Sequence, residues 1–391
     1  MPRQLAIFLV IIAVSITALF LIKKSDVVQV DEVLPAVVVD PMAEFLKPLA
    51  NPPKEIKAVY ATGWSGGSTK KMDYFIDLIK TTELNALVVD IKDYSGYIAY
   101  DIQVPDVIKY KAVEIKIPDL DELIYKLHKN NIYVIARLTV FQDPRFALAR
   151  PDLAVKSKKT GLTWKDNKGL SWMDPMSREV WDYNIAIAKD AALRGFDEIN
   201  FDYIRFPSDG AVDDLDYTFW DGQTSKSYSI LSFFSYLRNA LLGTKISADL
   251  FGYTTVLYND LGIGQIIEHA YKNFDYVSPM VYPSHYTRGY LNFSNPGAHP
   301  YEVVYDSIST AVRRLNDLRI TLLAKSSSTP SLAKLRPWLQ DFDLGADYTP
   351  EMVRAQIKAT YDSASTTPEA INGFMIWNAS NIYQKGAFLP E

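Results

Sequence analysis

Phe196-Asp-Glu-Ile-Asn-Phe-Asp-Tyr-Ile-Arg-Phe-Pro207 is the stretch of this 391-residue chain that decides its fold. Apolar and aromatic side chains alternate there with Glu198, Asn200 and Asp202. Because a strand projects successive side chains to opposite faces, these three polar groups share one face. Polar groups on a buried strand cost several kcal/mol unless they are partnered or used. In a barrel of parallel strands the active site lies at the C-terminal strand ends, so the stretch predicts a strand that delivers a carboxylate to such a site.

Strand and helix patterns alternate from residue 58 to the end of the chain. Eight strands are expected, at 58–64, 86–93, 132–141, 197–206, 245–253, 276–282, 335–342 and 373–378. Helical patterns fill the seven gaps, at 69–82, 119–130, 178–194, 227–242, 264–272, 301–317 and 350–362. Repeated alternation of this kind indicates a parallel sheet, and eight units match a (β/α)8 TIM barrel with insertions. A doubly wound open sheet is the alternative, and residues 320–327 are a second candidate for the seventh strand.

The N-terminal residues predict a membrane segment followed by a tether. Residues 5–22 carry no charge and are followed by Lys23 and Lys24. As a helix they would reach roughly 27 Å, close to the thickness of a hydrocarbon core, and a signal-peptide core is shorter, at about 7–15 residues. We therefore expect an uncleaved signal anchor at 1–24, a proline-containing tether at 25–55 and the barrel at 56–391. The barrel would lie outside the cytoplasm, with secretion after signal cleavage as the alternative.

Composition and spacing exclude several function classes. The net charge of −5 and pI near 5.5, with no basic face, argue against a nucleic-acid partner. The four histidines show no metal-ligand spacing, and neither a metal site nor a serine triad is expected. The chain has no cysteine, which excludes disulfides and thiolate chemistry. We expect no cofactor.

Polar or aromatic residues recur two positions apart near the C-terminal ends of most expected strands. Three of them, Asp90, Asp202 and Asp249, are carboxylates, the groups that acid and base catalysis on an acetal requires. A cation beside one carboxylate keeps it ionised while burial keeps another protonated, and aromatic rings offer flat amphipathic surfaces to sugar rings. The expected substrate-binding residues are Lys92, Arg137, Asn200, Arg205, Tyr282, Trp338, Gln340 and Trp377. Tyr282 and Arg205 would orient the acids, and Trp338 and Trp377 would stack the sugar.

Residues 57–385 resemble the bacterial glycoside hydrolase domain family, a family of uncharacterised barrels distantly akin to family-18 glycosidases. The motifs that carry the resemblance are Val89-Asp-Ile-Lys-Asp93, Ala136-Arg-Leu-Thr-Val-Phe141, Trp172-Met-Asp-Pro175, the 196–207 stretch, Ser278-Pro-Met-Val-Tyr-Pro283 and Pro337-Trp-Leu-Gln-Asp-Phe342. The resemblance implies a (β/α)8 barrel that acts on a polysaccharide or oligosaccharide.

The likeness to family-18 enzymes stops at one position. Asp197 to Asp202 is similar to their fourth-strand signature, but Ile204 occupies the place of their general-acid glutamate. An aliphatic side chain cannot donate a proton, so their substrate-assisted mechanism does not transfer. Either Asp202 serves as acid or nucleophile with Asp249 or Asp90 as partner, or the barrel binds a glycan without cleaving it. A structural envelope protein is a third hypothesis.

Overall fold

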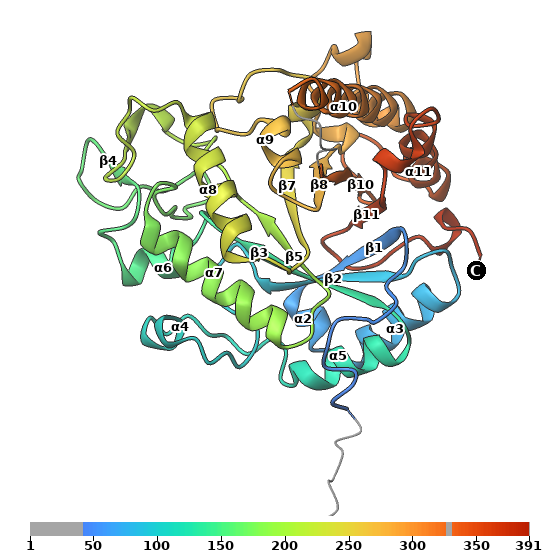
Figure 1. Ribbon diagram of the computed structural model, residues 1–391, viewed down its shortest axis with the longest axis horizontal. Helices are drawn as coiled ribbons and strands as arrows, with labels where there is room; N and C mark the ends of the chain where they lie inside the picture. The colour runs from blue at the N-terminus through green and yellow to red at the C-terminus, as the bar shows by residue number, and fades with distance from the viewer. Residues whose placement is uncertain (1–41, 326–330, 391) are drawn as a thin grey trace, which may run out of the picture. The chain divides into compact units, whose positions relative to one another are not determined.

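The computed structural model describes residues 42–325 and 331–390 of the chain. In this part, eight parallel strands close into a barrel (Figure 1). In order they are β1 (Ile56–Ala61), β2 (Ala86–Lys92), β3 (Tyr133–Thr139), β5 (Glu198–Asp202), β7 (Ile246–Phe251), β8 (Tyr276–Met280), β10 (Trp338–Gln340) and β11 (Gly373–Trp377). The last strand pairs with β1, and Met280 pairs with Trp338 across β8 and β10. The barrel is therefore closed, which confirms the predicted TIM-like fold and rules out the open sheet.

Helices cover the outside of the barrel (Figure 1). The described residues contain all seven expected helices: α3 (Thr69–Lys80), α5 (Leu120–Lys129), α7 (Arg178–Leu193), α8 (Lys226–Ala240), α9 (Ile267–Tyr271), α10 (Pro300–Leu323) and α11 (Pro350–Asp362). Five of these helices begin at a Ser, Thr or Asp whose side chain accepts a backbone N–H of the first turn, the usual signal that starts a helix. Because α10 continues to Leu323, residues 320–323 are helical and the seventh barrel strand is β10, as expected.

The core has two parts. The larger part fills the layer between strands and helices, and a smaller cluster that includes Ala58, Val88 and Ile135 fills the barrel interior. Near the N-terminal ends of the strands, fully buried Glu198 accepts a hydrogen bond from fully buried Arg336. Glu198, the first polar residue of the deciding stretch, is thus neutralised inside the barrel, because a charge taken out of water needs a partner.

The last part of the predicted tether contacts the barrel. The backbone N–H of Leu49 donates to Asp197 Oδ1 at 2.6 Å. Buried His128 joins the Phe45 carbonyl oxygen through Nδ1, at 2.6 Å, to Asp197 Oδ2 through Nε2, at 3.0 Å. The expected anchor at 1–24 and tether residues up to 41 lie outside the described residues, so that division of the chain stays a prediction. Among the residues that were described, no helix has the length and apolar character needed to cross a bilayer.

Two insertions form a small sheet beyond the barrel. Strand β4 (Lys156–Ser157) pairs antiparallel with β6 (Leu215–Asp216), so the long segments after β3 and β5 support each other. The Ser157 hydroxyl donates to Asp214 Oδ2 at 2.6 Å. The short helices α2 (Gly63–Gly66), α4 (Pro105–Lys109) and α6 (Pro144–Ala149) lie in the segments that follow β1, β2 and β3.

Candidate active site

Three aspartates from different strands converge on one buried arginine. Arg137 of β3 donates through Nη1 to Asp90 Oδ1 of β2 at 2.6 Å and through Nη2 to Asp202 Oδ2 of β5. Its Nε lies 3.7 Å from Asp249 Oδ2 of β7. The register explains this convergence, because Asp90 pairs directly with Arg137 and the four residues occupy the C-terminal parts of neighbouring strands. The structure thus brings all three predicted carboxylates together.

One guanidinium cannot balance three ionised carboxylates in a buried site. The pKa of Asp249 is raised to about 8. Burial is the largest cause, and the negative charge of Asp202, which raises the pKa, has a larger effect than the positive charge of Arg137, which lowers it. Burial also raises the pKa of Asp90, against the opposing effects of Arg137 and of the Tyr60 hydroxyl, which donates to Asp90 Oδ2 at 2.5 Å. A protonated Asp249 is the arrangement that burial and neighbouring charge favour at neutral pH.

Two donors hold the Asp249 carboxyl group in place. Asn200 Nδ2 and Trp338 Nε1 each donate to its Oδ1 at 2.8 Å, so the proton belongs on Oδ2. Trp338 is only 1% exposed, and its ring packs edge-on against Trp377 and Tyr60. The sugar-stacking role predicted for Trp338 is therefore wrong in this structure, because the ring is buried in the barrel and serves the carboxylate.

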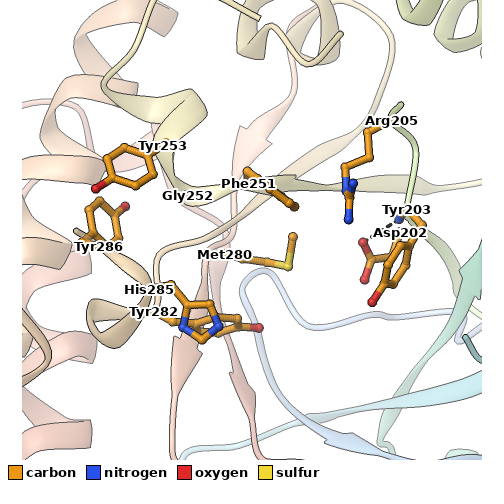
Figure 2. A pocket seen from close by; sticks show the side chains of 10 residues that line it. All are labelled: Asp202, Tyr203, Arg205, Phe251, Gly252, Tyr253, Met280, Tyr282, His285 and Tyr286. Atoms are coloured by element: carbon orange, nitrogen blue, oxygen red, sulfur yellow. Dashed lines mark hydrogen bonds between the residues drawn. The ribbon is translucent and has the colours of Figure 1, made fainter. Parts of the chain in front are cut away.

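Asp202 is the carboxylate of this cluster that faces open space. It lines a cavity of about 370 Å³, which we call the Asp202 cavity, together with Arg205 and the aromatic side chains Tyr203, Phe251, Tyr253, Tyr282 and Tyr286. Figure 2 shows Asp202 and Arg205 on one side of this cavity and the Tyr253–Tyr286 pair on the other, with Phe251 and Met280 between them.

The backbone immediately after Asp202 is strained. Tyr203 has a φ of 53°, the left-handed region that bulky side chains rarely occupy. Such a conformation costs about 1–3 kcal/mol and persists where surrounding structure enforces it, often at functional sites. The Tyr203 N–H donates to Asp202 Oδ1 at 2.6 Å. This hydrogen bond helps to fix the orientation of the carboxylate that lines the cavity.

A second cavity adjoins the first and includes Trp377. It has a volume of about 790 Å³ and shares Tyr282 and His285 with the Asp202 cavity. We call it the Trp377 cavity. The partly exposed Trp377 ring stacks on Tyr60 at 3.9 Å between centroids, and the Arg137 guanidinium lies 5.0 Å from its centre. Trp377 thus stands between the charged cluster and this second cavity, and the sugar-stacking role expected of it stays a prediction.

Two predicted substrate-binding residues are committed elsewhere. Lys92 is fully buried, pairs with Asp143 at 2.7 Å and donates to Asn184 at 2.8 Å. The register between β2 and β3 shifts between Asp90 and Lys92, so the alternation that would have placed both on one face is interrupted. Gln340 is fully buried, accepts from the Ser284 hydroxyl at 2.8 Å and donates to the backbone. The substrate-binding role predicted for both residues is corrected on these grounds.

Arg205 lines the cavity without contacting the acids. Its guanidinium donates to the Phe206 carbonyl oxygen and the Ser208 hydroxyl, and lies 4.6 Å from the centre of the Phe251 ring. Burial lowers its pKa. Its hydrogen bonds are made to residues 206 and 208, whereas the Asp202 carboxylate is oriented by Arg137 and the Tyr203 backbone N–H.

Sequence reasoning missed Tyr60 and Phe251. Tyr60 donates to Asp90 from near the C-terminal end of β1, and Phe251 lines the Asp202 cavity two positions after Asp249. Both obey the two-residue period that identified the other candidates. Extending that period to every aromatic residue at a strand end would have found them.

Residues 58–383 match the model of a protein family described as "Putative glycosyl hydrolase domain". The chain belongs to this family. The relationship inferred from the sequence motifs is thereby confirmed, and the barrel with its three carboxylates is the structure of a member of this family.

Solved structures similar to this chain include three of different origin. A hypothetical protein from Ruminiclostridium thermocellum ATCC 27405 is 40% identical, over 52% of this chain and 98% of that one, with a TM-score of 0.46. An α-galactosidase from Thermus thermophilus, in complex with stachyose, is 12% identical over 88% of this chain and 66% of its own, with a TM-score of 0.48. A variant of the glycoside hydrolase domain of PelA from Pseudomonas aeruginosa is 11% identical over 87% and 98%, with a TM-score of 0.41. No curated protein matches the chain.

Proposed function

We propose that this protein is a glycosidase that cleaves a polysaccharide or oligosaccharide, with Asp202 and Asp249 as its catalytic pair. One observation carries the proposal: a buried carboxyl group with a pKa of about 8 lies in the same cluster as a carboxylate that lines a cavity. Two carboxyl groups whose environments separate their protonation states supply the acid and the base or nucleophile of glycoside cleavage.

The environments suggest a role for each group. Asp249 keeps its proton at neutral pH and is the general acid for the leaving oxygen. Asp202, ion-paired with Arg137 and held by the Tyr203 N–H, is the carboxylate that attacks the sugar carbon or activates water. Arg137, Asn200 and Trp338 are positioning residues, because they touch the carboxyl groups and act through them.

Asp202→Asn tests the proposal directly. The full chain in detergent is incubated with a panel of cell-envelope and extracellular polysaccharides, and release of reducing ends is measured. Removing a catalytic carboxylate should lower the rate on the order of 10²–10⁴-fold or more, with an unchanged circular dichroism spectrum. Asp73→Asn, on the exposed surface of α3, is the matched control and should keep full activity. Undiminished turnover by folded Asp202→Asn protein would overturn the assignment.

The pH profile of the parent enzyme provides a second test. Because the general acid must carry its proton, kcat/KM should fall as pH rises through about 8, the pKa of Asp249. A rate that stays constant from pH 7 to pH 9.5 would contradict the role given to Asp249.

A glycan-binding barrel without hydrolysis is the second candidate. Ile204, at the position of the family-18 general acid, is fully buried in the core and cannot take part in chemistry. A pure binding protein would show affinity for a glycan, no turnover in the parent, and loss of affinity in Trp377→Ala. An enzyme would show turnover in the parent and retain binding in Asp202→Asn.

We also propose, from residues 1–24, that the barrel is anchored to a membrane and lies outside the cytoplasm. The uncharged 5–22 stretch supports this proposal. Fractionation of cells should recover the full chain with membranes, accessible to protease from outside. Full recovery in the medium with a new N-terminus after residue 22 would favour a cleaved signal instead.

A further inference from the structure

The Trp377 cavity extends the Asp202 cavity into one groove. Tyr282 and His285 line both cavities, so a ligand can pass from one to the other along a shared wall. The proposed reaction uses only the Asp202 cavity. The larger neighbouring cavity therefore has room for a further part of the same ligand, next to the bond that is cleaved.

The walls of the Trp377 cavity have the chemistry that sugar rings require. Trp377 and Phe342 offer aromatic surfaces, and Asn378, Ser380 and Gln384 are polar residues of the lining. Tyr282 and Phe342 pack edge to face at 5.6 Å between centroids, which gives the groove a rigid aromatic side. Apolar ring faces with a polar rim are typical of pockets that bind compact polar ligands.

The charged side chains that line this cavity are acidic. Asp341 and Asp343 line it, and no lysine or arginine is among its lining residues. His285 adds no positive charge at neutral pH, because burial lowers its pKa. The part of the chain that the structure describes gives neither aspartate an ion pair within 4.0 Å.

Asp341 is the more informative of the two acids. It is 1% exposed, and within the described residues its carboxylate accepts hydrogen bonds only from the backbone and side-chain N–H groups of Gln384, both at 3.2 Å. Burial raises its pKa, and the charge of Asp343 adds to the effect. A buried carboxylate that has few hydrogen bonds and no ion pair is stabilised by any cation that enters the cavity. Among the described residues no cluster has the ligands to hold a metal ion, so the cation that fits is a group on the substrate.

We propose that the Trp377 cavity is a second sugar subsite, selective for a sugar that carries a free ammonium group. The aromatic wall takes the ring, and Asp341 and Asp343 take the charge. The substrate is accordingly a chain that contains unacetylated amino-sugar units. This inference rests on the proposed glycosidase function for the meaning of the adjoining site, but the binding preference can be measured without catalysis.

Calorimetric titration of the full-chain Asp202→Asn protein tests the preference. The probes are three tetramers of equal length: glucosamine, N-acetylglucosamine and glucose. We expect the glucosamine tetramer to bind at least tenfold more tightly than the other two, with affinity falling as salt increases, because salt screens charge pairs. Equal affinity for all three probes would overturn the proposal.

Further substitutions test which side chains bind the ammonium group and the sugar ring. Adding Asp343→Asn should remove most of the preference for glucosamine and leave the weak binding of the glucose tetramer unchanged. Asp347→Asn, an exposed carboxylate outside the lining, is the matched control and should change neither. Trp377→Ala should weaken binding of every tetramer. Calcium binding that Asp343→Asn abolishes, without any preference for glucosamine, would identify a metal site and overturn the subsite.

The outcomes for the subsite and for the reaction separate cleanly. Selective binding of the glucosamine tetramer, with no turnover of any glycan by the parent, would refute the glycosidase and keep the subsite. Turnover of an uncharged glycan by the parent, with no preference for glucosamine, would refute the subsite and keep the glycosidase.

Discussion

Replacing Asp249 with asparagine should stabilise the protein increasingly as pH rises. The asparagine oxygen can accept the hydrogen bonds that Asn200 and Trp338 give to Asp249 Oδ1, and its amide group takes the place of the protonated oxygen. The substitution therefore copies the neutral acid that the fold prefers and removes the possibility of ionising it. Catalysis should be lost at the same time, because an amide cannot donate the proton.

The magnitude follows from the difference between the folded and unfolded pKa values of Asp249. Folding raises the pKa from 3.8 to about 8, so the folded state holds the proton more tightly. The stability contributed by the protonated group is fully present below 3.8 and is lost as pH rises to about 8. Each unit corresponds to 1.36 kcal/mol, which gives on the order of 5 kcal/mol in total and roughly 4 kcal/mol between pH 5 and pH 8.

Urea denaturation of parent and Asp249→Asn proteins at pH 5, 6, 7 and 8 measures the effect. The difference in free energy of unfolding, mutant minus parent, should rise by roughly 1.4 kcal/mol per pH unit. Using the difference cancels the other buried carboxyl groups, such as Asp90, whose pKa values are also raised. Asp73→Asn should give a parallel curve. If the Asp249→Asn curve is also parallel to the parent, Asp249 ionises normally and the acid role assigned to it is lost.

Three further substitutions test the remaining contacts. Lys92→Met should destabilise the fold by about 3–5 kcal/mol in urea, because it leaves Asp143 charged, buried and unpaired; weaker substrate binding at unchanged stability would instead restore the predicted binding role. Trp338→Ala should cost about 3–5 kcal/mol as a large buried ring, whereas a ring in open solvent would cost far less. His128→Ala should cost about 1–3 kcal/mol and expose residues 42–55 to limited proteolysis; an unchanged cleavage pattern there would show that the histidine does not hold the segment.

Local periodicity was enough to predict the strands and helices of this barrel. The alternation in β5 follows from covalent geometry, because successive side chains of any strand point to opposite faces. Parallel strands put their C-terminal ends on one side, so Asp90, Asp202 and Asp249 could be expected to meet without knowledge of any contact. Arg137 was found by the same rule. These predictions needed only the chain itself and the direction of its strands.

Contacts between distant residues decided which of those side chains are available for substrate. The bulge after Asp90 turns Lys92 away from the barrel interior, although both obey the same period in the sequence. Trp338 lies 89 positions from Asp249 and becomes its hydrogen-bond donor only once the barrel has closed. The raised pKa of Asp249 likewise depends on burial and on charges from other strands. Alternation is a property of neighbouring residues. Hydrogen-bond partners, burial and the electrostatic field of charges on other strands arise from the packing of the whole barrel, so only the tertiary structure determined them.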